Sequence, residues 1–252
     1  MALKAVIFDM DATLVDWSKR SADFAETRRS HLQKLYDYLV AAGHRLPDVN
    51  EFGKVYVRVL MRRWNANDPL SSPAPRFGDA LREILDSFAL SVDALDFDHL
   101  QTLVVGMLQA GVTAYPDAAG VLETLRAAGI RTGLLTNAPY PMFIRETELS
   151  ELKLIHLLDV YLSAEDVGYQ KPHPAAFAAV LERLGVTASE AIYVGDDLKD
   201  DVSGAQKAGM KAVWVSREVD LNPNAIIPDA TIEQLAELPG ILDQWFPGWR
   251  EA

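Results

Sequence analysis

The sequence predicts an α/β fold: a Rossmann-like parallel sheet covered by helices on both faces, with an inserted α-helical cap domain. Three observations predict it. Ala5–Phe8 is a short run of apolar, largely β-branched and aromatic residues, which is typical of a buried strand. About ninety residues follow with apolar side chains at helical spacing. From about residue 112 onward, short apolar strands alternate with helices, the pattern of a parallel sheet covered on both faces. The expected core is therefore residues 1–17 and 112–252, and the expected cap is residues 18–111.

Composition excludes several classes of function. The 252 residues suffice for one or two domains with a substantial core. A net charge of −12 without a long Lys/Arg run argues against nucleic acid or an acidic membrane surface as the main partner. There is no cysteine, which excludes disulfides, thiolate catalysis and Cys-ligated zinc. No apolar stretch approaches the roughly 20 residues of a membrane span, and no signal-peptide pattern precedes the first strand. The expected location is cytoplasmic.

The segment from about residue 20 to 110 is expected to be a helical bundle inserted after the first strand. A stretch with three prolines, residues 65–75, is expected to be a loop. Gly43 is a plausible end for the first helix. The apolar residues at helical spacing fall into four groups, which are Phe24 to Ala42, Val55 to Trp64, Leu81 to Phe88, and Leu95 to Leu108.

The second half is expected to alternate helices and strands. Pro116 suits the first turn of a helix that runs to Ala128 and is closed by Gly129. The expected strands are Arg131–Thr136, Val160–Ser163, 191–194 and 211–216, and the expected helices between them are 141–158, in one or two pieces, 174–184 and 201–208. Beyond Glu218 the pattern is mixed, and the aromatic residues Trp245, Phe246 and Trp249 are expected to cover an edge of the core.

Polar residues cluster where the predicted strands finish. In a parallel sheet these carboxyl ends lie at one edge, where such sheets bind ligands. The clusters are Asp9 with Asp11, Thr136-Asn137, residues 171–174 (Lys-Pro-His-Pro), and Gly195-Asp196-Asp197 followed by Asp200 and Asp201. Together they supply carboxylates, a hydroxyl, an amide and one ammonium group. That set suits phosphoryl transfer with Mg²⁺, which takes carboxylate, water and phosphate oxygens as ligands.

Each cluster also has an ordinary structural interpretation. Asp9 and Asp11 lie two residues apart, so in extended backbone their carboxylates point the same way and need a cation, a shared proton or open water. They are equally compatible with a polar loop. Thr136-Asn137 suits a turn or a helix cap, and Lys171 alone suits a solvated surface. The functional interpretation rests on all four clusters together, because they follow the predicted strands in order along the chain and all suit the same chemistry.

Over nearly its full length the chain resembles the haloacid dehalogenase (HAD) superfamily. Residues 9–13 (Asp-Met-Asp-Ala-Thr) match that family's Asp-x-Asp-x-Thr motif, and Thr136 matches the Ser or Thr that ends the next core strand. Lys171 with the following Pro-His-Pro matches the Lys motif, and Gly195-Asp196 with Asp201 matches the acidic motif. The helical insert resembles the family's type C1 cap.

The resemblance implies a Mg²⁺-dependent phosphomonoester hydrolase that acts on a small phosphorylated metabolite through an aspartyl-phosphate. Asp9 would be the nucleophile. Asp11 would protonate the leaving oxygen and then take a proton from the hydrolytic water. Thr136 would bind the phosphoryl group and Asn137 would help to place the substrate. Lys171 would pair with Asp9 and the phosphoryl oxygens.

By the same resemblance, Mg²⁺ would bind the Asp9 carboxylate, the Asp11 backbone carbonyl and Asp196. Asp201 would hold metal-bound water or orient a ligand. Asp197 and Asp200 are rivals of Asp201 for that role, because the acidic cluster makes the partner ambiguous.

The sequence departs from the family pattern at Ala12, where glycine is common. If this position needs a positive φ, alanine costs about 1 kcal/mol. Lys54, Arg58 and Arg62 share one helical face of the cap and could bind a second anionic group, although a solvated basic face is the favoured interpretation. His173 is expected to be a turn residue. The cap hinges are expected near residues 16–18 and 111–113.

Three alternatives stay open at this point. A 2-haloacid dehalogenase would use Asp9 without Mg²⁺, and Asp11 counts against it because a leaving halide needs no proton. A phosphomutase would return the phosphoryl group from Asp9 to its substrate. A non-catalytic phospho-ligand-binding regulator is opposed by the intact set of motif residues. The physiological substrate and the oligomeric state do not follow from the sequence.

Overall fold

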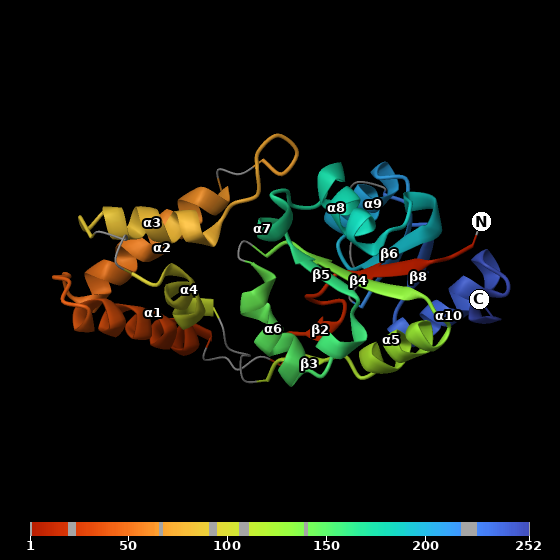
Figure 1. The fold of residues 1–252 in the computed structure, drawn as a ribbon, viewed down its shortest axis with the longest axis horizontal. Coiled ribbons are helices and arrows are strands. Elements are labelled where there is room, and N and C mark those ends of the chain that lie inside the picture. The colour runs from red at the N-terminus through yellow and green to blue at the C-terminus, as the bar shows by residue number, and fades with distance from the viewer. Residues whose placement is uncertain are drawn as a thin grey trace.

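The computed structural model describes residues 2–19, 24–65, 68–90, 95–105, 111–138, 141–217 and 226–251. Its centre is a six-stranded sheet in the order β5-β4-β1-β6-β7-β8, in which every neighbouring pair is parallel (Figure 1). The strands are β1 (Ala5–Phe8), β4 (Arg131–Thr136), β5 (Val160–Ser163), β6 (Ala191–Gly195), β7 (Lys211–Val215) and β8 (Ala230–Ile232). The predicted parallel sheet is confirmed, and β8 is a strand that the sequence did not predict.

The first strand is the centre of this sheet. β1 pairs with β4 on one side and with β6 on the other, so Phe8 lies beside Leu134 and Val194. All four residues of β1 are fully buried, as expected of a short apolar strand with neighbours on both sides. The carboxyl ends of β4, β1 and β6 therefore lie side by side, and the polar residues that follow them meet at one edge.

Helices cover both faces of the sheet because successive strand side chains point to opposite sides. Val6 and Phe8 pack into one hydrophobic cluster with α5 (Ala118–Ala127), α6 (Met142–Glu151) and α10 (Leu238–Trp245). Ala5 and Ile7 pack into another with α8 (Pro174–Leu184) and α9 (Gly204–Lys207), and Figure 1 shows the two groups on opposite sides of the sheet. Short 3₁₀ helices occupy Ile155–Leu157, Ala188–Glu190, Leu235–Glu237 and Trp249–Glu251.

The C-terminal aromatic residues lie where the sequence placed them. Phe246 and Trp249 are buried in the cluster on the α5 and α10 side of the sheet. Trp245 is partly buried and packs against the same cluster. Their predicted role in covering the core is confirmed.

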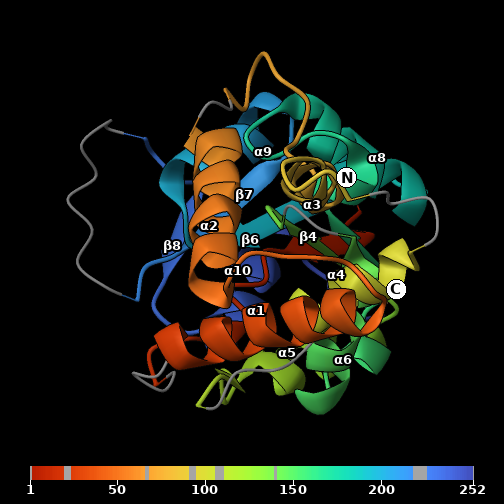
Figure 2. The ribbon, with the colours of Figure 1, turned by 90° about the vertical axis from the view of Figure 1, so that its left-hand side faces the viewer.

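In the described part of the inserted segment, four helices share a hydrophobic core of their own. They are α1 (Phe24–Ala41), α2 (Val49–Asn65), α3 (Phe77–Asp86) and α4 (Phe97–Val105). Leu39, Phe52, Leu81 and Leu100 are among the side chains buried between them. Figure 1 shows this bundle to one side of the sheet, and Figure 2 views the molecule from the bundle side. Met107 and Leu108, expected in the fourth helix, lie outside the described residues, and the domain boundaries 18 and 111 stay a prediction.

The bundle is joined to the rest of the molecule through short backbone contacts. β2 (Val15–Asp16) and β3 (Thr113–Ala114) pair antiparallel at the two predicted crossings between core and cap. Near α3, the Ala74 backbone N–H donates to the Gly168 carbonyl at 2.9 Å. The backbone N–H of Phe77 donates to Glu165 in α7 (Ala164–Val167) at 3.2 Å.

The helix expected over residues 201–208 begins earlier and in a different form. Residues Leu198–Ser203 form a turn of π-helix that continues into α9. The Asp197 carboxylate accepts hydrogen bonds from the Lys199 and Asp200 backbone N–H groups at 2.8 and 2.6 Å, and so caps this helix. The expected start at Asp201 was therefore wrong by three residues, because the cap lies at Asp197. None of the helices in the described ranges is both long and apolar enough to cross a membrane.

Ala12 has a φ of 63°, so this position does require the left-handed conformation that favours glycine. Ala12→Gly is expected to raise the free energy of unfolding by about 0.5–1 kcal/mol, because relief of the left-handed penalty exceeds the extra entropy of glycine in the unfolded chain. Urea unfolding measures this difference. The matched control Ala178→Gly, at an exposed position inside α8, is expected to lose about 1 kcal/mol. A less stable Ala12→Gly variant would contradict the expectation.

Candidate active site

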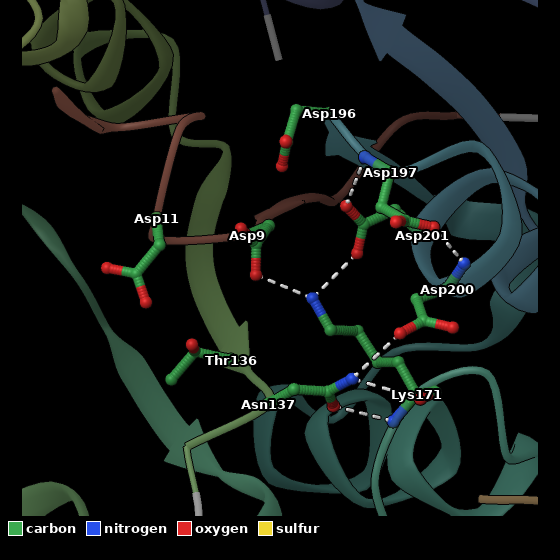
Figure 3. A pocket seen from close by; sticks show the side chains of 9 residues that line it. All are labelled: Asp9, Asp11, Thr136, Asn137, Lys171, Asp196, Asp197, Asp200 and Asp201. Carbon is green, nitrogen blue, oxygen red and sulfur yellow. Dashed lines mark hydrogen bonds and ion pairs between the residues drawn. The ribbon is translucent and has the colours of Figure 1, made fainter. Parts of the chain in front are cut away.

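One pocket lies at the carboxyl ends of β1, β4 and β6, and every site residue predicted from the sequence lines it (Figure 3). Its lining also includes both rivals for the last acidic role. The residues are Asp9, Asp11, Thr136, Asn137, Lys171, Asp196, Asp197, Asp200 and Asp201. The fold thus brings together four segments of the chain, of which the first and last residues, Asp9 and Asp201, lie 192 positions apart.

Three of these carboxylates form a compact cluster. Asp9, Asp196 and Asp201 each place one oxygen within 4.8 Å of the other two. Asp201 is 1% exposed, and one of its oxygens accepts the Asp197 backbone N–H at 3.0 Å. Gly195 makes this approach possible, because a Cβ at that position would lie 2.3 Å from Asp201 Oδ2. The glycine before the acidic pair is thus required by close packing.

Lys171 is the cation at the centre of the pocket. Its Nζ donates to Asp9 Oδ1 at 2.5 Å, to Asp201 Oδ1 at 2.6 Å and to the Tyr193 hydroxyl at 2.9 Å. The side chain is almost completely buried, and burial lowers its pKa. The adjacent Asp201 and Asp9 carboxylates outweigh that effect and hold the pKa of Lys171 well above its ordinary value. Lys171 therefore stays charged although it is buried, and this burial contradicts the interpretation as a solvated surface lysine.

The electrostatics of the cluster fit a divalent cation. Burial raises the pKa of Asp9; Lys171 opposes this effect, and the Asp201 and Asp196 carboxylates add to it. Burial and Asp201 likewise raise the pKa of Asp196 to about 6. One ammonium group thus faces three buried or half-buried carboxylates that repel one another. Oxygen donors this close together are the ligands that Mg²⁺ takes in proteins.

Asn137 ties the end of β4 to the loop that carries Lys171. Its side-chain oxygen accepts the Lys171 backbone N–H at 2.7 Å, and its amide nitrogen donates to the Lys171 carbonyl at 3.0 Å. The same nitrogen donates to Asp200 Oδ2 at 3.2 Å. These bonds orient the loop, while the role of Asn137 in placing substrate stays a prediction. Thr136 ends β4 and is buried at the same edge.

The two rivals of Asp201 have other contacts. Asp197 is exposed and caps the π-helical turn. Asp200 accepts the Asn137 amide, and burial together with Asp197 raises its pKa to about 6. Neither belongs to the compact cluster, so the geometry favours Asp201 as the acidic partner of Asp196.

Asp11 lies apart from the cluster. Figure 3 shows its carboxylate turned away from Asp9 and Asp196. Arg145 donates to both of its oxygens, from Nη1 to Oδ2 and from Nη2 to Oδ1, each at 2.8 Å, and Trp17 Nε1 donates to Oδ1 at 2.9 Å. Burial raises the pKa of Asp11, but the Arg145 charge and these hydrogen bonds outweigh it and hold the pKa below its ordinary value.

Arg145 was not predicted as a site residue, although the sequence carries a signal for it. Arg145 and Glu148 lie three residues apart on α6 and are both buried. Met142 and Leu149 are buried on the same helix. Two opposite charges within the apolar stripe of a helix indicate a buried ion pair with a specific partner. Here Arg145 Nε donates to Glu148 Oε2 at 2.8 Å.

Two further predictions concern residues around the pocket. His173 is the N-cap of α8, where its Nδ1 accepts the Ala175 N–H at 3.1 Å, so its interpretation as a turn residue is confirmed. Lys54, Arg58 and Arg62 on α2 are all exposed. Lys54 pairs with Glu51 and Arg62 pairs with Glu83, as a solvated basic face allows.

Comparison with known proteins agrees with this geometry. A family model described as haloacid dehalogenase-like hydrolase matches residues 3–209. The glyceraldehyde 3-phosphate phosphatase of Methanopyrus kandleri is 30% identical over 242 residues, which are 94% of this chain and 95% of that protein. Among solved structures, a HAD phosphatase from Thermococcus onnurineus has a TM-score of 0.61 at 30% identity, over 95% of this chain and 98% of the other. A 2-haloacid dehalogenase from Pseudomonas syringae pv. Tomato DC3000 has a TM-score of 0.66 at 27% identity, over 96% and 99%.

Proposed function

Because this chain belongs to the haloacid dehalogenase-like hydrolase family, we propose that it is a Mg²⁺-dependent phosphatase that hydrolyses the monoester of a small phosphorylated metabolite. The observation that carries the proposal is the division of the carboxylates in the pocket. Asp9 lies with Lys171, Asp196 and Asp201 in a cation-binding cluster, whereas Asp11 lies apart from it, held by Arg145. One carboxylate is thereby available as the nucleophile and another as the acid and base.

In the first step an Asp9 carboxylate oxygen attacks phosphorus. The bond between phosphorus and Asp9 forms as the bond to the leaving oxygen breaks. Asp11 gives a proton to that oxygen, and it must take up this proton before the step because Arg145 holds its pKa low. Lys171, 2.5 Å from Asp9 Oδ1, opposes the rise that burial causes in the pKa of Asp9, orients the nucleophile and faces the negative phosphoryl oxygens. The Thr136 hydroxyl at the end of β4 donates a hydrogen bond to the same group.

In the second step Asp11 takes a proton from water, and the water oxygen attacks phosphorus. The Asp9–phosphorus bond breaks, which releases inorganic phosphate and restores the Asp9 carboxylate and the proton on Asp11. Asp9 and Asp196, with the Asp11 backbone carbonyl, would hold Mg²⁺, and Asp201 would orient its water ligand. When bound, the ion supplies positive charge that neutralises the phosphoryl oxygens and the carboxylate cluster.

The remaining alternatives make different demands on the same pocket. A dehalogenase expels halide, which needs no proton, and the anchored Asp11 would then serve no step. A phosphomutase would require a bisphosphate activator. The substrate class and a cytoplasmic location stay predictions, as does the absence of nucleic acid or membrane partners.

The proposal is tested by p-nitrophenyl phosphate hydrolysis with and without Mg²⁺. We expect turnover with Mg²⁺, a loss of about 10²-fold or more in EDTA, and recovery when Mg²⁺ is restored. A panel of phosphorylated metabolites then ranks substrates by kcat/KM. The proposal is wrong if the folded protein with Mg²⁺ hydrolyses no phosphomonoester, if EDTA leaves the rate unchanged, or if the protein instead releases chloride from 2-chloropropionate.

A further inference from the structure

The Asp11 carboxylate is fixed by three hydrogen-bond donors. Arg145 approaches it with two parallel N–H groups, both at 2.8 Å from an oxygen, and Trp17 Nε1 contacts Oδ1 at 2.9 Å. A bidentate guanidinium–carboxylate pair sets the plane of the carboxylate as well as its position. The Trp17 indole, at the crossing between core and cap, adds a third hydrogen bond to the same carboxylate. The side chain of Asp11 therefore has a defined orientation rather than the freedom of a surface carboxylate.

Arg145 is itself held rigidly. Its side chain is 2% exposed, and Nε donates to Glu148 Oε2 at 2.8 Å. Glu148 is buried as well, so its carboxylate compensates the charge that Arg145 carries into the protein interior. The two residues sit three apart on α6, and the helix fixes their spacing. The guanidinium is thus preorganised before Asp11 binds to it.

The exposed fractions of Asp11 and Arg145 indicate that Asp11 faces the substrate and that Arg145 supports Asp11. The side chain of Asp11 is 43% exposed, whereas that of Arg145 behind it is 2% exposed. Asp11 lines the pocket, and Arg145 is absent from the pocket lining. Arg145 is therefore placed to act through Asp11 and not by touching a substrate.

We propose that Arg145, braced by Glu148, is a positioning residue that holds the acid and base Asp11 at the leaving-group side of the pocket. In an in-line displacement the leaving oxygen lies across phosphorus from the attacking Asp9 oxygen. The proton donor must therefore be kept apart from Asp9, and Figure 3 shows the Asp11 carboxylate turned away from it. Without the guanidinium, Asp11 would lose the bidentate pair that sets the plane and position of its carboxylate. This inference rests on the proposed phosphatase function.

Arg145→Gln is expected to lower kcat/KM only for substrates whose leaving oxygen must be protonated as it departs. Here kcat/KM is the right measure, because it covers the steps up to departure of the leaving group. For an alkyl monoester such as propyl phosphate we expect kcat/KM to fall about 10- to 100-fold, the effect of misplacing a general acid. For p-nitrophenyl phosphate, whose leaving group is a stable anion, we expect less than about a threefold change.

A double-mutant cycle shows whether Arg145 acts through Asp11. Asp11→Asn removes the acid, so adding Arg145→Gln to it should change kcat/KM for propyl phosphate by less than about twofold. Arg126→Gln is the matched control, because Arg126 pairs with Asp159 in an exposed ion pair remote from the pocket. That control should leave both substrates unaffected.

The possible outcomes separate the two proposals. If the wild type with Mg²⁺ hydrolyses neither ester, the phosphatase proposal fails. If the wild type hydrolyses both and Arg145→Gln loses equally on both, or loses further on top of Asp11→Asn, only the positioning role fails. Arg145→Gln leaves Glu148 buried without its partner, so thermal unfolding accompanies each assay. If that variant does not fold, Arg145→Gln/Glu148→Gln, which is neutral, carries the same test.

Discussion

Replacing Asp9 by asparagine is expected to abolish phosphatase turnover, by about 10⁴-fold or more, because the amide cannot act as the nucleophile. The unloaded protein should nevertheless be at least as stable as the wild type. Burial raises the pKa of Asp9, and a carboxyl whose pKa is higher when folded costs stability at every pH above its unfolded value of about 4. Asparagine at position 9 removes that cost at neutral pH, and Lys171 still has its ion pair with Asp201.

Thermal unfolding in EDTA and in Mg²⁺ measures both parts of this expectation. The wild type should gain more from Mg²⁺ than Asp9→Asn does, because a ligand stabilises the state that binds it. Asp243→Asn is the matched control, since Asp243 pairs with Arg250 in an exposed ion pair, and its turnover should be normal. Retained activity in Asp9→Asn would refute the nucleophile assignment, and a large loss of stability in EDTA would refute the electrostatic argument.

Lys171→Met is expected to damage both catalysis and stability. Two carboxylates that now lie 2.5 and 2.6 Å from the ammonium group would be buried without a cation. Removing one partner of a buried ion pair costs about 3–5 kcal/mol, which urea unfolding at pH 7 measures. The loss should shrink as the pH falls, because burial raises the pKa of Asp9 and protonation of Asp9 removes part of the uncompensated charge. We also expect turnover of p-nitrophenyl phosphate to fall about 10³-fold.

A second substitution distinguishes charge from packing as the cause. Lys171→Met/Asp201→Asn should recover part of the lost stability and none of the activity. Lys54→Met, at an exposed ion pair with Glu51, should leave the free energy of unfolding close to that of the wild type. A Lys171→Met protein as stable as the wild type would show that the buried pairs contribute little.

The extent to which the sequence predicted the fold depended on the length of each element. Arg131–Thr136 and Val160–Ser163 were predicted with their observed bounds, because each contains a short apolar stretch and alternates with helical segments along the chain. The two-residue strands β2 and β3 and the three-residue strand β8 were missed. So short a strand has no detectable period, and it forms only because its pairing partner is brought beside it.

The site was predictable to the extent that it follows from topology. Parallel strands bring their carboxyl ends to one edge, so Asp9, Thr136 and Asp196 could be placed in one pocket before any contact was known. The residues that contact Lys171 and Asp11 in the pocket were not predictable in this way. Tyr193 lies within an apolar strand, and its hydroxyl reaches Lys171 only in the folded packing. The Arg145 contact with Asp11 spans 134 positions in the chain, and no local pattern encodes it.

The central position of β1 in the sheet has a consequence for the order of folding. Its two neighbours begin at Arg131 and Ala191, so each residue of β1 pairs with residues at least 126 positions away in the sequence. The bundle of α1 to α4 is built from contacts far closer in sequence. Because long loops must close before such distant pairings are rewarded, we expect β1, the first strand of the chain, to be among the last elements to form its hydrogen bonds.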